Sequence, residues 1–434
     1  MNIILIAVDT LRADRLGCYG YTRGTSPNID RLARDGVLFE NCFAVGIPTH
    51  PAYTTIMTGV HPLLHRIVCH AGKVNLSPTI TMLSEYLNRY GYTTIAVDNL
   101  ATATGAGWFA RGYRYYFSTG GVTVISQGVK VNAEATNEVA LEALELALKK
   151  SRDKGFFVFI HYWDPHAPYL PPKGYIGKFY EGDPSKGDVE DRLGKSLWGR
   201  LLLNGWVGEL VRSGVRDKSY IDASYDAEIL YVDERIGELL TKIDELGLTD
   251  DTVVMLTADH GEGLGEHEIY YDHHGLYEWD VKVPLIIKYP TRIPKGIRIK
   301  VMVSHMDIMP TLLELADVPI PEKVSGSSLL TILDGKWDGH PMLCMVENTR
   351  MTKRALRTEK WKLIETLRPD IYGRPAGHIE LYDLEKDPKE TENVADLNRE
   401  LALQLLGRME KLYRSITRGA SDPLIEQEIS LPVE

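Results

Sequence analysis

The sequence has little of what marks disulfide-rich, membrane-spanning or nucleic-acid-binding proteins. It holds four cysteines in 434 residues, none in a C-x-x-C pair, which excludes a disulfide framework. No apolar run reaches the roughly 20 residues that a membrane helix needs. Acidic residues outnumber basic ones by 60 to 49, and this net charge of -11 argues against general binding to nucleic acids or anionic membranes. An anionic small molecule stays open as a substrate, because a metal or a local dipole can reverse the field in one pocket.

The start of the chain also lacks the basic stretch and cleavage site of a signal peptide, because residues 2–8 already have the pattern of a buried strand. Together with the scarcity of cysteine, this predicts a protein of the reducing cytoplasm. Hydrophobic residues make up 44% of the chain and charged residues 25%, which is ordinary for a globular protein and excludes global disorder. The length favours one large α/β domain with an appendage, or two to three domains.

Short apolar strands alternate with amphipathic helices over the first 340 residues. We expect strands at 2–8, 93–98, 156–163, 252–258 and 283–289. We expect helices at 26–35, with Ser26 as N-cap, and at 79–90, 133–150, 221–246 and 305–316, the last bent by Pro310. This alternation predicts a mostly parallel sheet covered by helices on both faces.

The pattern changes near residue 341. Short, closely spaced strand candidates follow, and then a helix at about 396–416, which predicts a small antiparallel sheet and a C-terminal α+β subdomain over residues 341–434. Residues 171–217 interrupt the alternation of strands and helices within the larger domain. They could form a lid over a site at the strand ends, or a surface insertion packed on the core.

Polar side chains stand directly after two of the expected strands, at the edge where open parallel sheets bind ligands. Asp9 follows the first strand, and Asp259 and His260 follow the strand at 252–258. Asp9 alone could cap the next helix, but two strand ends that each carry an aspartate favour a metal site. Carboxylate oxygens mixed with an imidazole nitrogen suit zinc or manganese better than calcium.

Thr49 lies where a helix is expected to begin, with Pro51 in the first turn. Its hydroxyl could simply cap that helix. Alternatively, it could point at an anion held by the free N–H groups and positive dipole end of the helix. A hydroxyl needs a metal or a base to become a nucleophile at neutral pH.

Two more segments gather histidines near strand ends. His161, Asp164 and His166 end the strand at 156–163, and His166 could donate to a charged oxygen or protonate a leaving group. The segment 272–274 reads Asp-His-His, and its histidines could hold substrate or a second metal, although isolated histidines are more often structural.

These segments resemble, in family order and over nearly the whole chain, the sulfatase branch of the alkaline phosphatase superfamily. The matching segments are VDTLRADRLGCYG (8–20), TSPNIDRLARDGVLFENCFA (25–44), the TG at 58–59, DPHAPYLPP (164–172), TADHGEGLGEH (257–267), HGLYEWDVKVPLI (274–286) and ELYDLEKDPKETENVA (380–395). The resemblance implies an alkaline-phosphatase-like α/β fold, with a catalytic domain over residues 1–340 and a smaller C-terminal subdomain. It also implies a site for one divalent metal ion.

The resemblance implies roles for individual residues. The expected metal ligands are Asp9, Asp259 and His260. The expected catalytic residues are Thr49 as nucleophile, His166 as a substrate-contacting histidine and His274 at a position that holds the anion. The residues expected around the substrate are Tyr53, Asn99, His161 and Asp164.

The chain departs from the family pattern at the nucleophile. Sulfatases usually carry Cys or Ser in C/S-x-P-x-R and convert it to formylglycine, whereas this chain has Thr49-His50-Pro51-Ala52-Tyr53. Threonine cannot become formylglycine, and none of the four cysteines begins such a motif elsewhere. Thr10 replaces the second aspartate of the usual pair, and Asn99 begins the segment where the family usually has Lys-x-His.

These departures change the expected chemistry. A formylglycine hydrate can expel sulfate, but a threonine adduct must be cleaved by water, and relatives with threonine here are mostly phosphodiesterases, phosphonate-ester hydrolases and phosphoryl transferases. We therefore expect a metal-dependent hydrolase of phosphodiester or phosphonate esters. One convincing ligand set and few cationic residues favour a singly charged group over a dianion.

Alternatives stay open: a sulfate-ester hydrolase that works without formylglycine, a transferase, or an anion-binding homologue that has lost catalysis. The expected partner is a small anionic ester, with no nucleic acid and no membrane. Association of identical subunits through the C-terminal sheet stays open.

Overall fold

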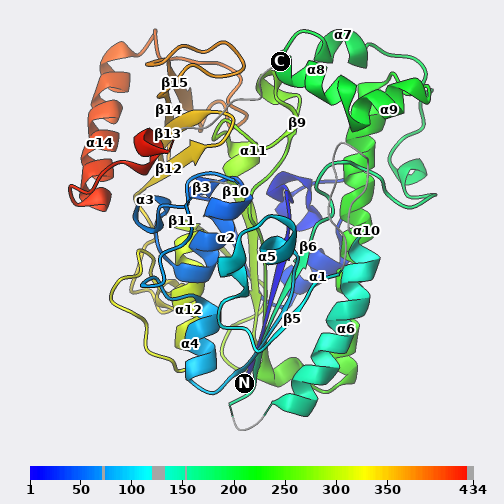
Figure 1. Cartoon of the computed structure of the whole chain (residues 1–434), viewed down its shortest axis with the longest axis vertical. Helices are drawn as coiled ribbons and strands as arrows, with labels where there is room; N and C mark the ends of the chain where they lie inside the picture. The colour runs from blue at the N-terminus through cyan, green and yellow to red at the C-terminus, as the bar shows by residue number, and fades with distance from the viewer. Residues whose placement is uncertain (71–73, 120–131, 152–153, 428–434) are drawn as a thin grey trace.

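An eight-stranded sheet runs through the centre of the molecule (Figure 1). The computed structural model describes residues 1–70, 74–119, 132–151 and 154–427. In spatial order the strands are β11 (Ile297–Ser304), β2 (Val37–Phe43), β10 (Lys282–Lys288), β7 (Thr252–Ala258), β1 (Asn2–Val8), β6 (Phe156–Tyr162), β4 (Thr93–Val97) and β5 (Tyr115–Phe117). The paired strands run parallel except for β10, which is antiparallel to both of its neighbours.

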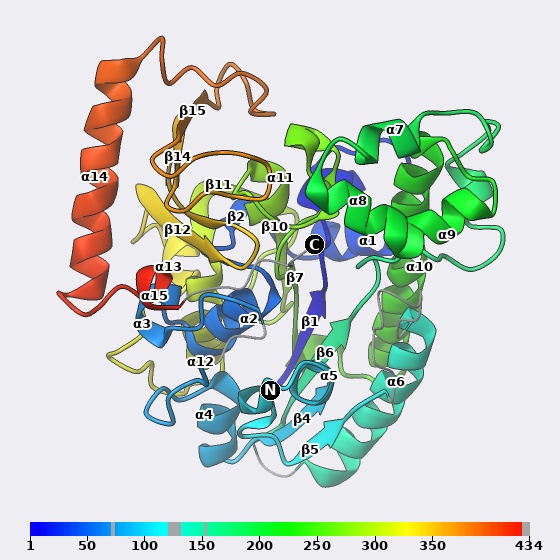
Figure 2. The same cartoon turned by 45° about the horizontal axis from the view of Figure 1, so that its top comes forward.

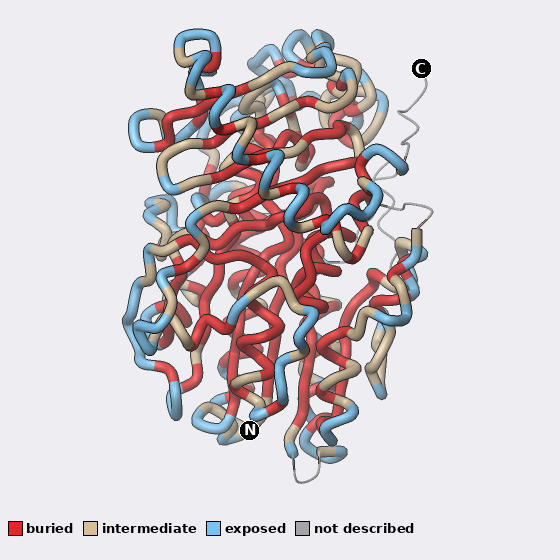
Figure 3. Tube along the Cα trace, turned by 90° about the vertical axis from the view of Figure 1, so that its left-hand side faces the viewer, coloured by how far each residue is buried: buried red, intermediate tan, exposed pale blue. Residues whose placement is uncertain are grey.

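Helices cover both faces of this sheet (Figures 1 and 2). One face carries α1 (Pro27–Arg34), α6 (Ala133–Lys150) and α10 (Lys218–Glu245), and the other carries α2 (Thr49–Thr58), α4 (Leu83–Arg89) and α12 (Ile308–Leu315). Because both faces are covered, the central strands are mostly apolar and buried, as the burial-coloured trace shows (Figure 3). The expected α/β class with a mostly parallel sheet is confirmed.

A second, five-stranded sheet lies beside the first. Its order is β15 (Ile379–Asp383), β14 (Trp361–Thr366), β13 (Thr352–Thr358), β12 (Met342–Asn348) and β3 (Gly46–Ile47), and α14 (Arg399–Thr417) packs against it. Strand β3 comes from the N-terminal part of the chain and pairs in parallel with β12 just before α2 begins. The division of the chain at residue 340 stays a prediction.

The remaining elements are short. They are α3 (Pro62–His65), α5 (Leu100–Ala103), α7 (Val189–Leu193), α8 (Leu197–Asn204), α9 (Trp206–Arg212), α11 (Glu278–Val281), α13 (Leu330–Leu333), α15 (Pro423–Glu426), β8 (Gly263–Leu264) and β9 (Tyr270–Asp272). Over the described ranges, every helix is too short or too polar to span a lipid bilayer.

Several local expectations differ from the structure for identifiable reasons. Ser26 is the N-cap residue of α1, as expected, but its side chain makes no capping bond. Its hydroxyl bonds Gly17 and Asp30, while Asp233 of α10 accepts the N–H groups of Asn28 and Ile29. Pro310 lies in the first turn of α12 and not in its middle, so its missing N–H interrupts no hydrogen bond within that helix. The helix expected over 79–90 begins only at Leu83.

Residues 171–217 form α7, α8 and α9 beside one end of α10 (Figure 1). Trp206 is buried, and its ring centroid lies 5.1 Å from that of Tyr169 and 5.7 Å from that of Tyr271. Trp198 donates its indole N–H to the carbonyl oxygen of Tyr270 at 3.0 Å. The segment is therefore packed on the core close to β9, and its role as a lid stays a prediction.

Replacing Ile6 by alanine tests the central role of β1. Ile6 is fully buried between β6 and β7, so Ile6→Ala should lower the free energy of unfolding by about 2–5 kcal/mol in a denaturant titration. The matched control is Ile320→Ala, whose side chain is 40% exposed and should cost less than about 0.5 kcal/mol. Equal effects of the two changes would contradict this assignment of the core.

Glu380 tests the electrostatics of the small sheet. Burial alone would raise its pKa, but Lys353 and Arg374, with hydrogen bonds from Tyr277 and Tyr382, lower that pKa to about 2. Because the folded-state pKa is depressed, the ionised carboxylate stabilises the fold above pH 4.5, and this stabilisation is lost as the pH falls toward 2.

The variant Glu380→Gln should therefore lower the free energy of unfolding by roughly 3 kcal/mol at pH 7, estimated from the shift in pKa. Urea titrations at pH 7 and pH 3.5 should show the difference from wild type narrowing at the lower pH. The exposed control Glu392→Gln should show little change at either pH. A pH-independent difference for Glu380→Gln would show that packing, not charge, is responsible.

Candidate functional site

The neighbouring parallel strands β1 and β7 bring three expected metal ligands together. Val8 lies opposite Ala258, so Asp9 and Asp259 leave the sheet side by side at its carboxyl edge. One ligand atom each of Asp9, Asp259 and His260 lie within 4.8 Å of one another, and all three side chains are fully buried. We call these three residues the first cluster.

The backbone after β1 fixes the orientation of Asp259. Thr10 has a φ of 53°, in the left-handed region, and its N–H donates to Oδ1 of Asp259 at 3.0 Å. The N–H of His260 donates to the same oxygen at 2.9 Å. The position that usually carries a second aspartate in the family thus contributes a backbone donor here.

The first cluster fits a divalent cation. Oδ1 of Asp9 and Oδ2 of Asp259 are buried and accept no hydrogen bond from any residue that the structure describes. Burial, together with the charge of Asp9, raises the pKa of Asp259 well above its ordinary value. Two adjacent buried carboxylates are unfavourable without a compensating positive charge, and a cation at this point would supply it.

Thr49 stands at the first position of α2, against the first cluster. Its Oγ1 lies 3.3 Å from Nε2 of His260. Burial lowers the pKa of His260, and its Nδ1 donates to the carbonyl oxygen of Gly261 at 2.9 Å. The neutral ring therefore presents an unprotonated Nε2 to the cluster and to Thr49.

His161 lies behind Asp9. Its Nδ1 is 2.8 Å from Oδ1 of Asp98, and its Nε2 is 3.3 Å from Oδ2 of Asp9. Burial alone would lower its pKa, but the bonds to Asp9 and Asp98 raise that pKa to about 9, so the ring is an imidazolium at neutral pH. Since both ring nitrogens are engaged by carboxylates, this arrangement orients Asp9.

Three more residues are expected around the substrate, and each has its own set of contacts. The ring of Tyr53 is fully buried and meets His161 edge-on, with centroids 4.8 Å apart. Asn99 bonds the side chain and backbone of Thr119. Asp164 accepts the N–H of Ala133 at the start of α6 at 2.5 Å. Their contact with substrate stays a prediction.

The histidines of the two later segments converge beside the first cluster. The ring centroid of His273 lies 4.4 Å from that of His260 and 5.5 Å from that of His166. His274 is held between Asp272, 3.2 Å from Nε2, and Glu347 of β12, 2.6 Å from Nδ1. Burial alone would lower the pKa of His274, but these two carboxylates raise it to about 10.

Sequence reasoning missed three side chains that belong to this environment. His70 is half-buried and its ring lies against that of His50 at a centroid distance of 4.1 Å, and the charges of Asp9 and His260 act on it. Burial lowers its pKa to about 4, so the ring is neutral. Asp98 and Glu347 orient other site residues. Asp98 directly follows β4, as Asp9 follows β1, and this signal could have found it. No motif or spacing marks His70 and Glu347, because their contacts join distant segments.

Two family descriptions match the chain: "Sulfatase" over residues 1–318, and "N-sulphoglucosamine sulphohydrolase, C-terminal" over residues 265–415. The chain belongs to the sulfatase family. It is therefore a hydrolase that acts on ester bonds, as the sequence motifs predicted. Members of the family generally use a divalent metal, which agrees with the buried ligand set of the first cluster.

Relatives support this assignment over almost the whole chain. The chain is 24% identical to N-acetylglucosamine-6-O-sulfatase of Bacteroides thetaiotaomicron, over 95% of this chain and 87% of the relative. A structure solved in complex with its substrate D-glucosamine-2-N,6-O-disulfate has a TM-score of 0.77 and 21% identity, covering 97% of this chain and 99% of that chain. The structure of phosphonate monoester hydrolase of Agrobacterium radiobacter has a TM-score of 0.73 and 22% identity. It covers 98% of this chain and 97% of that chain. At these identities the structural likenesses show a common fold.

Adding a divalent cation to the metal-free sulfatase-family chain tests the first cluster. Mn²⁺ or Zn²⁺ should raise the midpoint of thermal unfolding, and a cation at 100 times its Kd stabilises the folded state by about 2.7 kcal/mol. The rise should be smaller in Asp259→Asn, because one buried ligand is lost, and unchanged in the exposed control Asp334→Asn. An undiminished rise in Asp259→Asn would contradict this site.

Proposed function

We propose that the chain hydrolyses a singly charged anionic ester through nucleophilic attack by Thr49. The observation that carries the proposal is the position of the Thr49 hydroxyl, 3.3 Å from Nε2 of His260 and at the start of α2. A hydroxyl in this place adjoins both a buried ligand set for a cation and the N–H groups of a helix N-terminus, which favour an anion.

Each step of the proposed hydrolysis uses particular residues of the chain. Thr49 attacks the central sulfur or phosphorus atom, and the bond from that atom to the leaving oxygen breaks. His166 supplies the proton that the leaving oxygen takes up, and the proton that the Thr49 hydroxyl loses restores His166. Water then cleaves the Thr49 adduct and restores the hydroxyl. A divalent cation bound by Asp9, Asp259 and His260 would supply positive charge that favours the alkoxide and neutralises the anion. His161 keeps Asp9 in place through its ion pair at 3.3 Å.

The similarities support a sulfate ester as the first candidate substrate. The N-acetylglucosamine-6-O-sulfatase of Bacteroides thetaiotaomicron and an arylsulfatase of Clostridium perfringens are similar to this chain, which favours sulfate over the phosphorus esters that the sequence favoured. This chain would then be a sulfatase that works without formylglycine, since Thr49 cannot form that group. The reacting group of both candidate esters carries a single charge, which suits a site with few cationic side chains.

Phosphodiesters and phosphonate esters form the second candidate class. Thr49 as nucleophile favours these phosphorus esters, because a threonine adduct can be broken down only by attack of water. Zinc or manganese is the proposed metal, since an imidazole joins two carboxylates. A reducing compartment such as the cytoplasm is proposed because all four cysteines are free thiols.

A panel of aryl esters tests the substrate class. The metal-loaded protein is assayed against aryl sulfate, bis-aryl phosphate and aryl phosphonate. Turnover of the sulfate above the other two would support the first candidate, and the reverse order would support the second. No turnover of any of these esters would count against the hydrolase proposed here.

The variant Thr49→Ala tests the nucleophile on whichever ester turns over. It should lower kcat at least about 1,000-fold, because the other catalytic groups act together with the nucleophile and cannot replace it. Thr49→Ser should keep part of the activity, since it keeps the hydroxyl. The matched control is Thr58→Ala, at the other end of α2, whose hydroxyl bonds the carbonyl oxygen of Thr54. Full activity in Thr49→Ala would refute the assigned nucleophile.

A further inference from the structure

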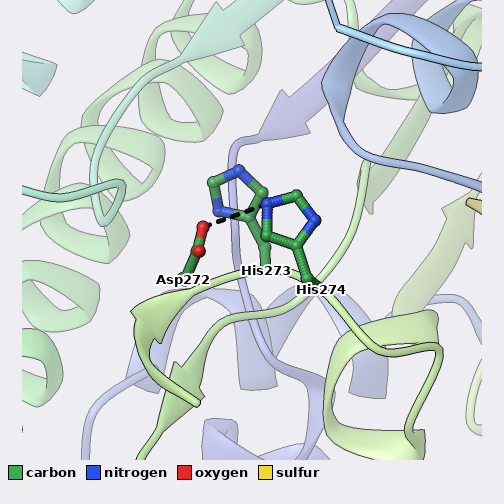
Figure 4. Close-up of side chains that lie close together, drawn as sticks. All are labelled: Asp272, His273 and His274. Atoms are coloured by element: carbon green, nitrogen blue, oxygen red, sulfur yellow. Dashed lines mark ion pairs between the residues drawn. The ribbon is translucent and has the colours of Figure 1, made fainter. Parts of the chain in front are cut away.

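Asp272, His273 and His274 follow one another at the end of β9, and their side chains converge (Figure 4). We call them the second cluster. We propose that the second cluster holds a second divalent cation beside the cation of the first cluster. The inference deepens the proposed function, but the cation count that tests it is measured without any substrate.

The donor atoms of the second cluster have the spacing of a metal site. One ligand atom each of Asp272, His273 and His274 lie within 4.8 Å of one another, and Oδ1 of Asp272 is 3.2 Å from Nε2 of His274. The side chains of Asp272 and His274 are buried, whereas that of His273 is 17% exposed. Two imidazoles and one carboxylate with an open position form a known ligand set of catalytic zinc.

The residues behind the second cluster orient its ligands. Glu347 lies 2.6 Å from Nδ1 of His274 and also accepts the N–H of Gly275 at 2.8 Å, so Nε2 is turned toward the cluster. Arg350 lies 3.1 Å from Oδ2 of Asp272, which leaves Oδ1 directed at His274. A carboxylate behind a ligating histidine is the usual outer-shell arrangement of metal sites.

Two buried carboxylates give the cation an electrostatic reason to bind. Glu262 is fully buried, and the hydroxyl of Tyr169 is its hydrogen-bonding partner. Its Oε1 lies 3.5 Å from Nδ1 of His273. Asp280 is also fully buried with both oxygens unbonded among the described residues. Burying a carboxylate without a donor or a counter-charge is costly, and a cation on the second cluster would offset this cost.

The second cluster adjoins the first without sharing a ligand with it. The rings of His273 and His260 stack with centroids 4.4 Å apart, and His260 is the first-cluster ligand that contacts Thr49. Positive charge at the second cluster would therefore act on the same substrate anion as Thr49. The second cation would thus neutralise substrate charge in a chain that lacks the arginine and lysine usual in sulfatases.

Equilibrium dialysis against a series of free Zn²⁺ concentrations tests the proposal on the whole chain. Bound zinc per chain is measured by elemental analysis at each concentration. The wild type should reach a plateau near two. Asp9→Asn should lose one site, and His273→Ala should lose the other, so that each reaches a plateau near one. The matched control His378→Ala, at a surface position outside both clusters, should stay near two.

Two results would overturn the proposal. One is a wild-type plateau near one that Asp9→Asn abolishes, which would leave the second cluster as a metal-free anion holder. The other is a plateau near two that His273→Ala leaves unchanged, which would place the second ion elsewhere. The number of zinc ions bound per wild-type chain tests the proposal even where a variant fails to fold. A wild-type chain that binds two zinc ions but hydrolyses none of the esters would count against the proposed function and not against the second cation site.

Discussion

The candidate site depends on the parallel pairing of β1 with β7. Their register sets Val8 beside Ala258, so the next residues, Asp9 and Asp259, meet at the sheet edge as two buried carboxylates. Like charges this close disfavour each other, and burial strengthens the effect. The imidazolium of His161 and the donors of Thr10 and His260 compensate part of that charge, and a cation would compensate the rest.

The small C-terminal sheet supports the site from the other side. In the register of β12 and β3, Glu347 lies opposite Ile47, two residues before Thr49. The same Glu347 holds His274 through Nδ1. One strand of the second sheet thus positions both the segment that leads to the candidate nucleophile and a histidine of the second cluster. The C-terminal residues therefore contribute to a site built mainly by the large sheet.

The sequence predicted the parts of the fold and of the site that depend on local pattern. Continuous apolar runs marked β1, β6 and β7, and polar residues after them marked Asp9, Asp259 and His260. It missed β2 and β11, whose partly exposed strands carry interspersed polar residues, and β5, which has only three residues. It gave no sign that β10 runs antiparallel. It also could not foresee that Glu347 and His274, 73 residues apart, would pair. Such long-range contacts depend on sheet topology, which local periodicity does not encode.

The most direct test of the central claim is the anomalous diffraction of a crystal of the wild-type chain equilibrated with Mn²⁺. The account predicts a strong peak within coordination distance of the carboxylates of Asp9 and Asp259 and of Nε2 of His260, with Oγ1 of Thr49 turned toward it. A crystal whose strongest peak lies away from the carboxyl edge of β1 and β7, with Asp9 and Asp259 free of metal, would contradict the account.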